Sequence, residues 1–324
     1  LRRETIHSML AIRACFASPL GAPALRSVIT QRMPEAVVRG ERNASVKQLR
    51  LRLASVKSIQ RITKTMKMVA AAKLKGFQTR MFEARPLGER VNYIVSQIPA
   101  ANEEEAAKDL KHLLLPITSD RGLCGGVNGA VAKQVKALFT TLPADTDLFV
   151  IGNKGEGLLK RTHQNNIKRL VSDCYKNPTT FALASEIAEE VASSVKYDKA
   201  TLVFNQFKSA IAYNTLAQEI ESAELMTERL ATFSEKYEFE DEFAESVWMQ
   251  DMMHFCLATK IYASLLEAAT AEVSARMQAM ENATKNCGEM ITKLTLQMNK
   301  ARQAMITQEL GEIVSGAAAV AESK

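Results

Sequence analysis

The sequence predicts an α/β fold in which a small globular domain is inserted between two long terminal helices that pair as an antiparallel coiled coil. Two helical stretches predict the coiled coil. One runs from about 43 to 98, and the other runs from about 247 to 320 and contains no proline. The stretch between them alternates short apolar runs with helical segments, which is the order typical of an α/β domain.

Composition is that of a folded protein: 47% of the 324 residues are hydrophobic, 24% are charged and the formal net charge is +6. No run of about 18 apolar residues occurs, so we expect no membrane-spanning helix.

Residues 1 to 40 are rich in arginine and hydroxyl side chains but contain only two acids, Glu4 and Glu35. This composition predicts a mitochondrial or other organellar transit peptide, or else a disordered basic start. The arginines are Arg2, Arg3, Arg13, Arg26, Arg32 and Arg39.

Residues 41 to 100 are predicted to form the N-terminal coiled-coil helix, with Asn43 or Ser45 as its N-cap. Pro86 and Gly88 predict a kink or break within it. Two apolar stripes follow helical spacing, first Val46, Leu49, Leu53 and Val56, then Ile59, Ile62, Met66 and Val69.

The same helix is strongly basic. Between Glu41 and Arg80 only Glu41 is acidic, and Phe77 is the only aromatic residue after Asn43. A basic amphipathic helix can bind nucleic acid, anionic lipid or an acidic protein surface. The scarcity of aromatic side chains weighs against single-stranded nucleic acid. A basic coiled-coil adaptor is therefore the alternative function. The basic residues are Arg42, Lys47, Arg50, Arg52, Lys57, Arg61, Lys64, Lys67, Lys73, Lys75 and Arg80.

Residues 108 to 222 are predicted to form an α/β domain with a largely parallel, Rossmann-like sheet. We expect the last two strands, which meet near Ser209, to pair antiparallel. The predicted strands are 113–118, 147–152, 167–172, 201–207 and 210–220, and the predicted helices are 127–139, 155–163 and 179–195.

Glycines follow the first two strands, at a position where a turn can cradle phosphate. Neither turn has the Lys-Ser or Lys-Thr of a P-loop or the spacing of a dinucleotide fingerprint, so we expect close strand-to-helix packing and no nucleotide. Asp120 and Arg121 lie where a catalytic pair could lie, but a capping or ion-pair role is the better interpretation. The widely spaced cysteines form no C-x-x-C pair.

Residues 223 to 246 include many acids and are predicted to be an exposed connection into the C-terminal coiled-coil helix, residues 247 to 321. Its apolar positions form one stripe that rotates into a second. They are Met290, Leu294, Met298, Ala301 and Met305, then Ile306, Leu310, Ile313 and Ala317.

Four stretches of this chain resemble the gamma subunit of F-type, proton-transporting ATP synthases of the mitochondrial type. They are IQRITKTMKMVAAAKL (59–74), TSDRGLCGG (118–126), ARMQAMENATKNCGEMITKLTLQ (275–297) and NKARQAMITQELGEIVSGAAAV (299–320). They occur in the family's order, and the resemblance covers about Ala44 to Val320.

The resemblance implies a central stalk rotor that couples proton-driven rotation of the c-ring to conformational change at the catalytic beta subunits. It implies no catalysis by this chain, no cofactor and no nucleic acid. The implied partners are alpha and beta subunits, small epsilon and delta subunits and the c-ring. The implied location is the matrix side of the mitochondrial inner membrane, as a peripheral subunit.

The resemblance also implies site residues. A beta-subunit interface would include Met66, Lys67, Arg302 and Gln303. A bearing tip would include Ile313, Val314, Ala317, Ala318 and Ala319, and a motif in the α/β domain would include Asp120, Arg121, Gly122 and Cys124.

Overall fold

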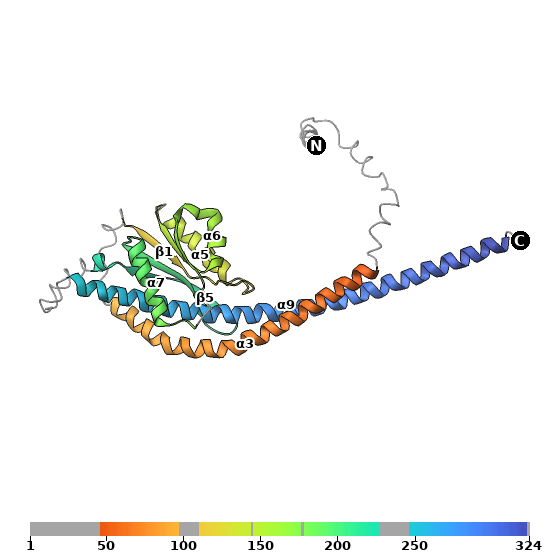
Figure 1. The fold of residues 1–324 in the computed structure, drawn as a ribbon, viewed down its shortest axis with the longest axis horizontal. Coiled ribbons are helices and arrows are strands. Elements are labelled where there is room, and N and C mark those ends of the chain that lie inside the picture. The colour runs from red at the N-terminus through yellow and green to blue at the C-terminus, as the bar shows by residue number, and fades with distance from the viewer. Residues whose placement is uncertain (1–45, 97–109, 144, 176–177, 227–245, 323–324) are drawn as a thin grey trace, which may run out of the picture. The chain divides into compact units, whose positions relative to one another are not determined.

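A computed structural model describes residues 46–96, 110–143, 145–175, 178–226 and 246–322 (Figure 1). The chain divides into two compact units. One unit runs from Val56 to Ile291. The other unit consists of two segments, the one up to Ser55 and the one from Thr292 onward. The predicted transit segment, the proposed caps Asn43 and Ser45 and most of the acidic connection lie outside the described residues.

The larger unit contains a five-stranded sheet in the order β3-β2-β1-β4-β5. The strands are β1 (His112–Pro116), β2 (Asp147–Ile151), β3 (Ile167–Val171), β4 (Lys199–Phe207) and β5 (Tyr213–Glu221). Strands β1 to β4 are parallel, and β4 pairs antiparallel with β5 from Lys199↔Glu221 to Phe207↔Tyr213. The predicted mixed sheet, with its antiparallel last pair, is confirmed.

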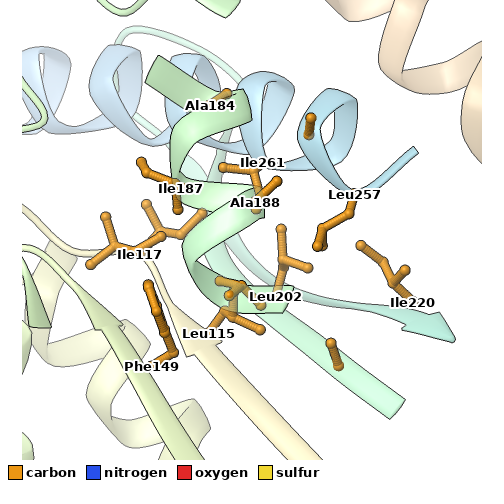
Figure 2. Close-up of a cluster of buried hydrophobic side chains, with 14 of the residues drawn as sticks. Leu115, Ile117, Phe149, Ala184, Ile187, Ala188, Leu202, Ile220, Leu257 and Ile261 are labelled. Carbon is orange, nitrogen blue, oxygen red and sulfur yellow. The ribbon is translucent and has the colours of Figure 1, made fainter. Parts of the chain in front are cut away.

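Helices cover both faces of the sheet, as an α/β architecture requires. One face packs on α5 (Val127–Thr141) and α6 (Asn153–His163), through apolar residues such as Val131 and Leu159. The other face packs on α7 (Phe181–Ser194) and on the long helix α9 (Ser246–Glu322) (Figure 2). Alternate strand residues point to opposite faces, so Leu115 belongs to one core and Leu114 to the other.

The C-terminal helix therefore forms part of the domain core before it forms a coiled coil. From Cys256 to Ile261 every residue of α9 is buried. Its Leu257 and Ile261 contact the same apolar cluster as Leu202 of β4 (Figure 2). This packing anchors the long helix to the sheet.

The N-terminal helix α3 (Val46–Ser96) packs along α9 within the larger unit. Thr284 Oγ1 donates to Thr63 Oγ1 at 2.9 Å, and Lys67 Nζ lies 3.1 Å from Glu281 Oε1. The predicted pairing of the two terminal helices is confirmed.

Of the kink or break predicted at Pro86 and Gly88, the break is wrong, because α3 continues through both residues. Proline has no amide hydrogen, so the carbonyl of Phe82 lacks its helical hydrogen-bond donor. Pro86 and Phe82 are both exposed, so water can hydrate that carbonyl. Gly88 serves close packing: a Cβ there would lie 2.9 Å from the Cβ of Ala263.

The second apolar stripe of the N-terminal helix is wrong as a buried face at three of its four positions, and only Met66 is half-buried. Its members Ile59, Ile62 and Val69 are 50%, 54% and 57% exposed, whereas Thr63 and Ala70 are buried. The first stripe continues along the helix at three- and four-residue steps through these small and polar residues. Ile59, Ile62 and Val69 therefore point outward.

The C-terminal stripe is partly confirmed. Met290, in the larger unit, is exposed; in the other unit Leu294, Met298 and Ala301 are half-buried, but Met305 is exposed. Every α9 residue from Arg302 to Ala321 is exposed in the chain as described.

Candidate partner-binding surfaces

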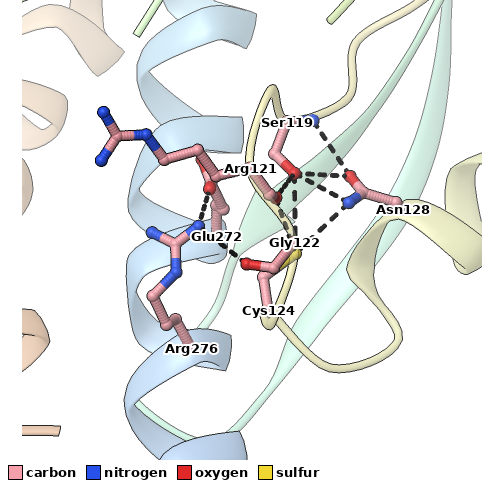
Figure 3. Close-up of polar contacts among 7 residues, drawn as sticks. All are labelled: Ser119, Arg121, Gly122, Cys124, Asn128, Glu272 and Arg276. Atoms are coloured by element: carbon pink, nitrogen blue, oxygen red, sulfur yellow. Dashed lines mark hydrogen bonds and ion pairs between the residues drawn. The ribbon is translucent and has the colours of Figure 1, made fainter. Parts of the chain in front are cut away.

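The loop that connects β1 to α5 is held by a buried polar network (Figure 3). Asn128 Nδ2 donates to Ser119 Oγ at 2.7 Å and contacts Cys124 Sγ at 3.3 Å, while its Oδ1 accepts from the Ser119 amide at 3.0 Å. Ser119 Oγ donates to the carbonyl oxygen of Arg121 at 2.7 Å. These contacts fix the loop's backbone from inside.

Helix α9 holds the same loop from the outside. Arg276 Nη2 donates to the Gly122 carbonyl oxygen at 3.5 Å and is also paired with Glu272 Oε1 (Figure 3). Burial raises the pKa of the Glu272 carboxyl, an effect that the Arg276 charge and hydrogen bond oppose. The loop and α9 are thus joined by the hydrogen bond from Arg276 to Gly122, and Glu272 on the same helix holds the Arg276 guanidinium.

Asp120 has a capping role, one of the two roles that the sequence favoured for it. Its Oδ1 accepts from the amide of Asn153, the first residue of α6, at 3.2 Å. A carboxylate at a helix N-terminus satisfies a donor and complements the helix dipole.

The glycine turn before α6 serves packing, which is consistent with the expectation from its spacing. The next two amides of the helix also bind oxygens of this chain: Lys154 N donates to Ser119 O at 3.1 Å and Gly155 N to Thr118 Oγ1 at 2.9 Å. The amides that a phosphate would need already have partners. Gly152 has φ +97°, and a Cβ there would lie 2.2 Å from the Thr118 carbonyl oxygen.

The residues Met66 and Lys67 lie half-buried on α3, beside a basic groove. The groove has a volume of about 720 Å³. One acid, Glu281, lies among five cations, and Lys67 pairs with it. The groove is lined by Lys57, Gln60, Arg61, Lys64, Lys67, Met68, Glu281, Thr284, Lys285 and Ile291.

The remaining predicted site residues belong to the other unit. Arg302 and Gln303 are exposed on α9, immediately after the half-buried Ala301. The predicted tip residues are also exposed, with Ile313 and Val314 each 67% accessible, together with Ala317, Ala318 and Ala319.

Sequence reasoning missed the residues that organise the loop and the helix pair. Glu272 and Arg276 have the i, i+4 spacing of a helical ion pair, which is a readable signal. Asn128, nine residues after Ser119, had no such signal. Arg85 and Glu267, which lie 182 residues apart, bond through Nε and Oε1 at 2.8 Å and could not be paired from one sequence.

Comparison with known proteins identifies the family. A family model described as ATP synthase matches residues 45–320. The mitochondrial ATP synthase gamma subunit of Drosophila melanogaster is 39% identical over 278 residues, covering 86% of this chain and 91% of the relative. The mitochondrial gamma subunit of Rattus norvegicus is 40% identical over 281 residues, covering 86% and 100%.

Solved structures agree with the sequence comparison. A chain from the central stalk and c-ring of Tetrahymena thermophila mitochondrial ATP synthase is 30% identical, with a TM-score of 0.56, covering 68% of this chain and 99% of that one. A chain from the Euglena gracilis mitochondrial enzyme shares the fold, with a TM-score of 0.70 at 20% identity over 86% and 95% of the two chains.

Among the described residues, no helix combines the length and the apolarity needed to span a membrane. The matched residues include the basic face of α3, the loop after β1 and the exposed end of α9. The chain belongs to the gamma subunit family of ATP synthase, whose members are the non-catalytic rotor subunits of the central stalk.

Proposed function

We propose that this chain couples rotation of a c-ring to conformational change at catalytic beta subunits, and that the outward face of α3 carries one of the coupling contacts. The observation behind this proposal is an exposed surface that is both apolar and basic. Ile59, Ile62, Met68 and Val69 are 50–57% exposed on a helix that also presents the basic groove. Exposed apolar residues beside charge mark a surface for a protein partner.

The partner that fits this surface is acidic. Lys57, Arg61 and Lys64 line the groove, and the one acid there, Glu281, already bonds to Lys67. Carboxylates of beta would therefore find cations at several positions along one face. A shaft that presents this face to one subunit at a time stabilises a different conformation in each of them.

The contacts near the other end of the coiled coil involve Arg302 and Gln303. Both side chains are exposed, and a guanidinium can form a bidentate, charge-assisted bond to a beta carboxylate. We assign Lys67 to the same interface because it lines the basic groove, and Met66 because it directly precedes Lys67 on α3. The alpha subunits are the other proposed members of the ring that surrounds the coiled coil.

The bearing tip, 313–319, is proposed to centre the shaft. Ala317, Ala318 and Ala319 are exposed and small, so they can turn against an apolar wall without strong contacts. Deleting residues 316 to 324 should leave measurable rotation and ATP hydrolysis in the assembled enzyme. Complete loss of both would assign torque to the tip.

The α/β domain is the proposed site of attachment to the c-ring and to small epsilon and delta subunits. The similar Tetrahymena chain comes from a central stalk and c-ring assembly, and the Euglena chain from an assembly of OSCP, F1 and c-ring. Purifying the assembled enzyme through a tag on this chain, followed by mass spectrometry, should recover these subunits. Recovery of the alpha–beta ring without c-ring would contradict the attachment.

The proposed location is the matrix side of the mitochondrial inner membrane, because the relatives cited above are mitochondrial. The Arg-rich start is the proposed transit peptide, with cleavage between about Gln31 and Ala44. N-terminal sequencing of the mature protein tests this. A mature chain that begins at or before Ala11 would contradict it.

The groove is tested by charge reversal in enzyme assembled with the alpha and beta subunits. The triple variant Lys57→Glu, Arg61→Glu, Lys64→Glu should lower ATP synthesis, and raised salt should weaken the wild-type contact in the same direction. The matched control reverses two exposed bases on α5, Lys133 and Lys136.

Loss of synthesis in the groove variant alone supports the proposal. Equal activity of wild type, groove variant and control across ionic strength would refute it. Arg302→Ala should lower coupling in the same assay, and Arg302→Lys should restore only part of it because an ammonium lacks the planar fork.

A further inference from the structure

A small polar cavity lies where α3, α9 and the β4–β5 pair meet, and it shares no lining residue with the basic groove. Its volume is about 60 Å³. A water molecule needs about 10–15 Å³ of such space, so the cavity can hold a small ion or a few waters but no nucleotide. Three elements contribute hydrogen-bond donors to its wall: Arg85 and Asn92 of α3, Gln206 and Gln218 of β4 and β5, and Lys260 and Ser264 of α9.

Lys260 brings a buried positive charge to this cavity. The residue is only 4% exposed, and its ammonium donates to the carbonyl oxygen of Glu219 at 3.1 Å. Burial lowers the pKa of Lys260, and the opposing effects of Cys256 and Glu221 are smaller. No ion pair among the described residues includes Lys260. A buried ammonium without an anionic partner is costly, so the cavity favours a bound negative charge.

Ser264 supplies a second donor one turn further along α9. The residue is 1% exposed, and within the described part of the chain its Oγ has no hydrogen-bond partner. Lys260 and Ser264 are four residues apart, so they share one face of the helix, and both line the cavity. The side-chain amides of Gln206 and Gln218 can donate from the sheet. Ammonium, hydroxyl and amide N–H groups together are the donors that bind an anion.

Two acids also line the cavity, but neither compensates Lys260. Glu267 accepts from Arg85 Nε and from the Phe207 amide, each at 2.8 Å, so its charge is already matched by a guanidinium. Glu89 is exposed, so water and salt screen its charge. The charge of Lys260 is therefore the one that the buried wall of the cavity leaves unmatched.

We propose that this cavity binds a small monovalent anion of the size of chloride, held by Lys260 Nζ and Ser264 Oγ together with the amides of Gln206 and Gln218. One negative charge is sufficient to match one buried ammonium, and the small volume excludes polyphosphates. The donors come from α9 and from the sheet, so the anion ties the long helix to the edge of the α/β domain. This inference does not depend on the proposed function.

Thermal unfolding of the full chain tests the site when sodium gluconate is replaced by sodium chloride at constant ionic strength. Gluconate is too large for the cavity, so the wild-type unfolding temperature should rise with chloride and then saturate, which gives the dissociation constant. Lys260→Met should abolish the saturable rise, and Ser264→Ala should weaken chloride binding by about fivefold because one donor is lost. The control Lys133→Met, at an exposed lysine of α5, should respond as wild type does.

Bromide locates the ion directly, because its anomalous scattering distinguishes it from water. In crystals of the assembled enzyme grown in bromide, we expect an anomalous peak within hydrogen-bond reach of Lys260 Nζ and Ser264 Oγ. Absence of that peak in wild type, or equal chloride responses of wild type and Lys260→Met, would overturn the proposal. A peak that persists in Lys260→Met would mark an adventitious ion only, with the same consequence. If Lys260→Met does not fold, Ser264→Ala and the wild-type bromide peak still decide the question.

Discussion

Replacing Glu267 should destabilise this chain more than replacing an exposed acid, because Glu267 joins three elements. Its Oε1 accepts from Arg85 Nε of α3 at 2.8 Å, and its Oε2 accepts from the Phe207 amide of β4 at 2.8 Å. Arg85 Nη2 also donates to the Phe207 carbonyl at 3.2 Å. The side chain of Glu267 is only 9% exposed and that of Arg85 is 29% exposed.

The magnitude follows from what each substitution leaves behind. Glu267→Leu leaves a half-buried guanidinium and a buried amide without an acceptor, which should lower the free energy of unfolding by about 3 kcal/mol. Glu267→Gln keeps an acceptor for the Phe207 amide and loses the charge, so it should cost about 1.5 kcal/mol. For a domain of this size, the larger loss corresponds to roughly 6–12 °C in melting temperature.

Urea and thermal unfolding of the full chain, followed by circular dichroism, measure both losses. Glu281→Gln is the matched control, because this acid forms an exposed inter-helix pair and its removal should have a much smaller effect. If Glu267→Leu changes the free energy of unfolding by less than about 0.5 kcal/mol, the ion pair does not tie α3 to the sheet. A Glu267→Gln loss equal to that of Glu267→Leu would show that charge alone matters.

Two further predictions concern a turn and a titration. Gly152→Ala should destabilise the chain by at least about 2 kcal/mol, because it combines positive φ with a clash against the Thr118 carbonyl. The control is Gly157→Ala on α6, where an added Cβ meets no other atom. Equal unfolding temperatures of the two variants would contradict the clash. The hydrogen bond and charge of Lys67 lower the pKa of Glu281 from 4.5, so its stabilising contribution is present above pH 4.5 and is lost as the pH falls through the lowered folded-state pKa. In an NMR titration Lys67→Met should move that pKa back up toward 4.5, and an unchanged value would show that the pair does not form.

Local pattern was sufficient to predict the sheet and its helices. Leu113, Leu114 and Leu115 are all fully buried because their strand has helices on both faces, and such strands read as continuous apolar runs. The antiparallel last pair followed from the short connection at Ser209, whose carbonyl accepts from the Ala212 amide at 3.2 Å.

Pattern failed where the coiled-coil seam uses small and polar side chains. Thr63 is buried and hydrogen-bonded to Thr284, so the seam there carries no apolar signal. The apolar Ile59 and Ile62, which look like core in a single sequence, serve the outward face instead. Hydrophobic periodicity identifies a face that avoids water, and it does not distinguish the chain's own core from a surface for another subunit.

The candidate site was predictable as a set of motifs but not as an arrangement. Asp120 and Arg121 could be picked from sequence, with a capping or ion-pair role as the favoured interpretation. The contact between Gly122 and Arg276 spans 154 residues and depends on α9 passing beside the loop. Rules that read neighbouring residues along the sequence cannot predict a contact between residues so far apart in the chain.

The outward apolar side chains of α3 also bear on how a cell handles this subunit before assembly. A newly made chain exposes Ile59, Ile62, Met68 and Val69 of α3 to water, and also Leu310, Ile313 and Val314 of α9. Exposed apolar surface of this kind promotes aggregation and attracts chaperones. Surplus copies made without matching ring subunits should therefore be bound by holdases and degraded, which would keep the amount of rotor matched to the number of rings.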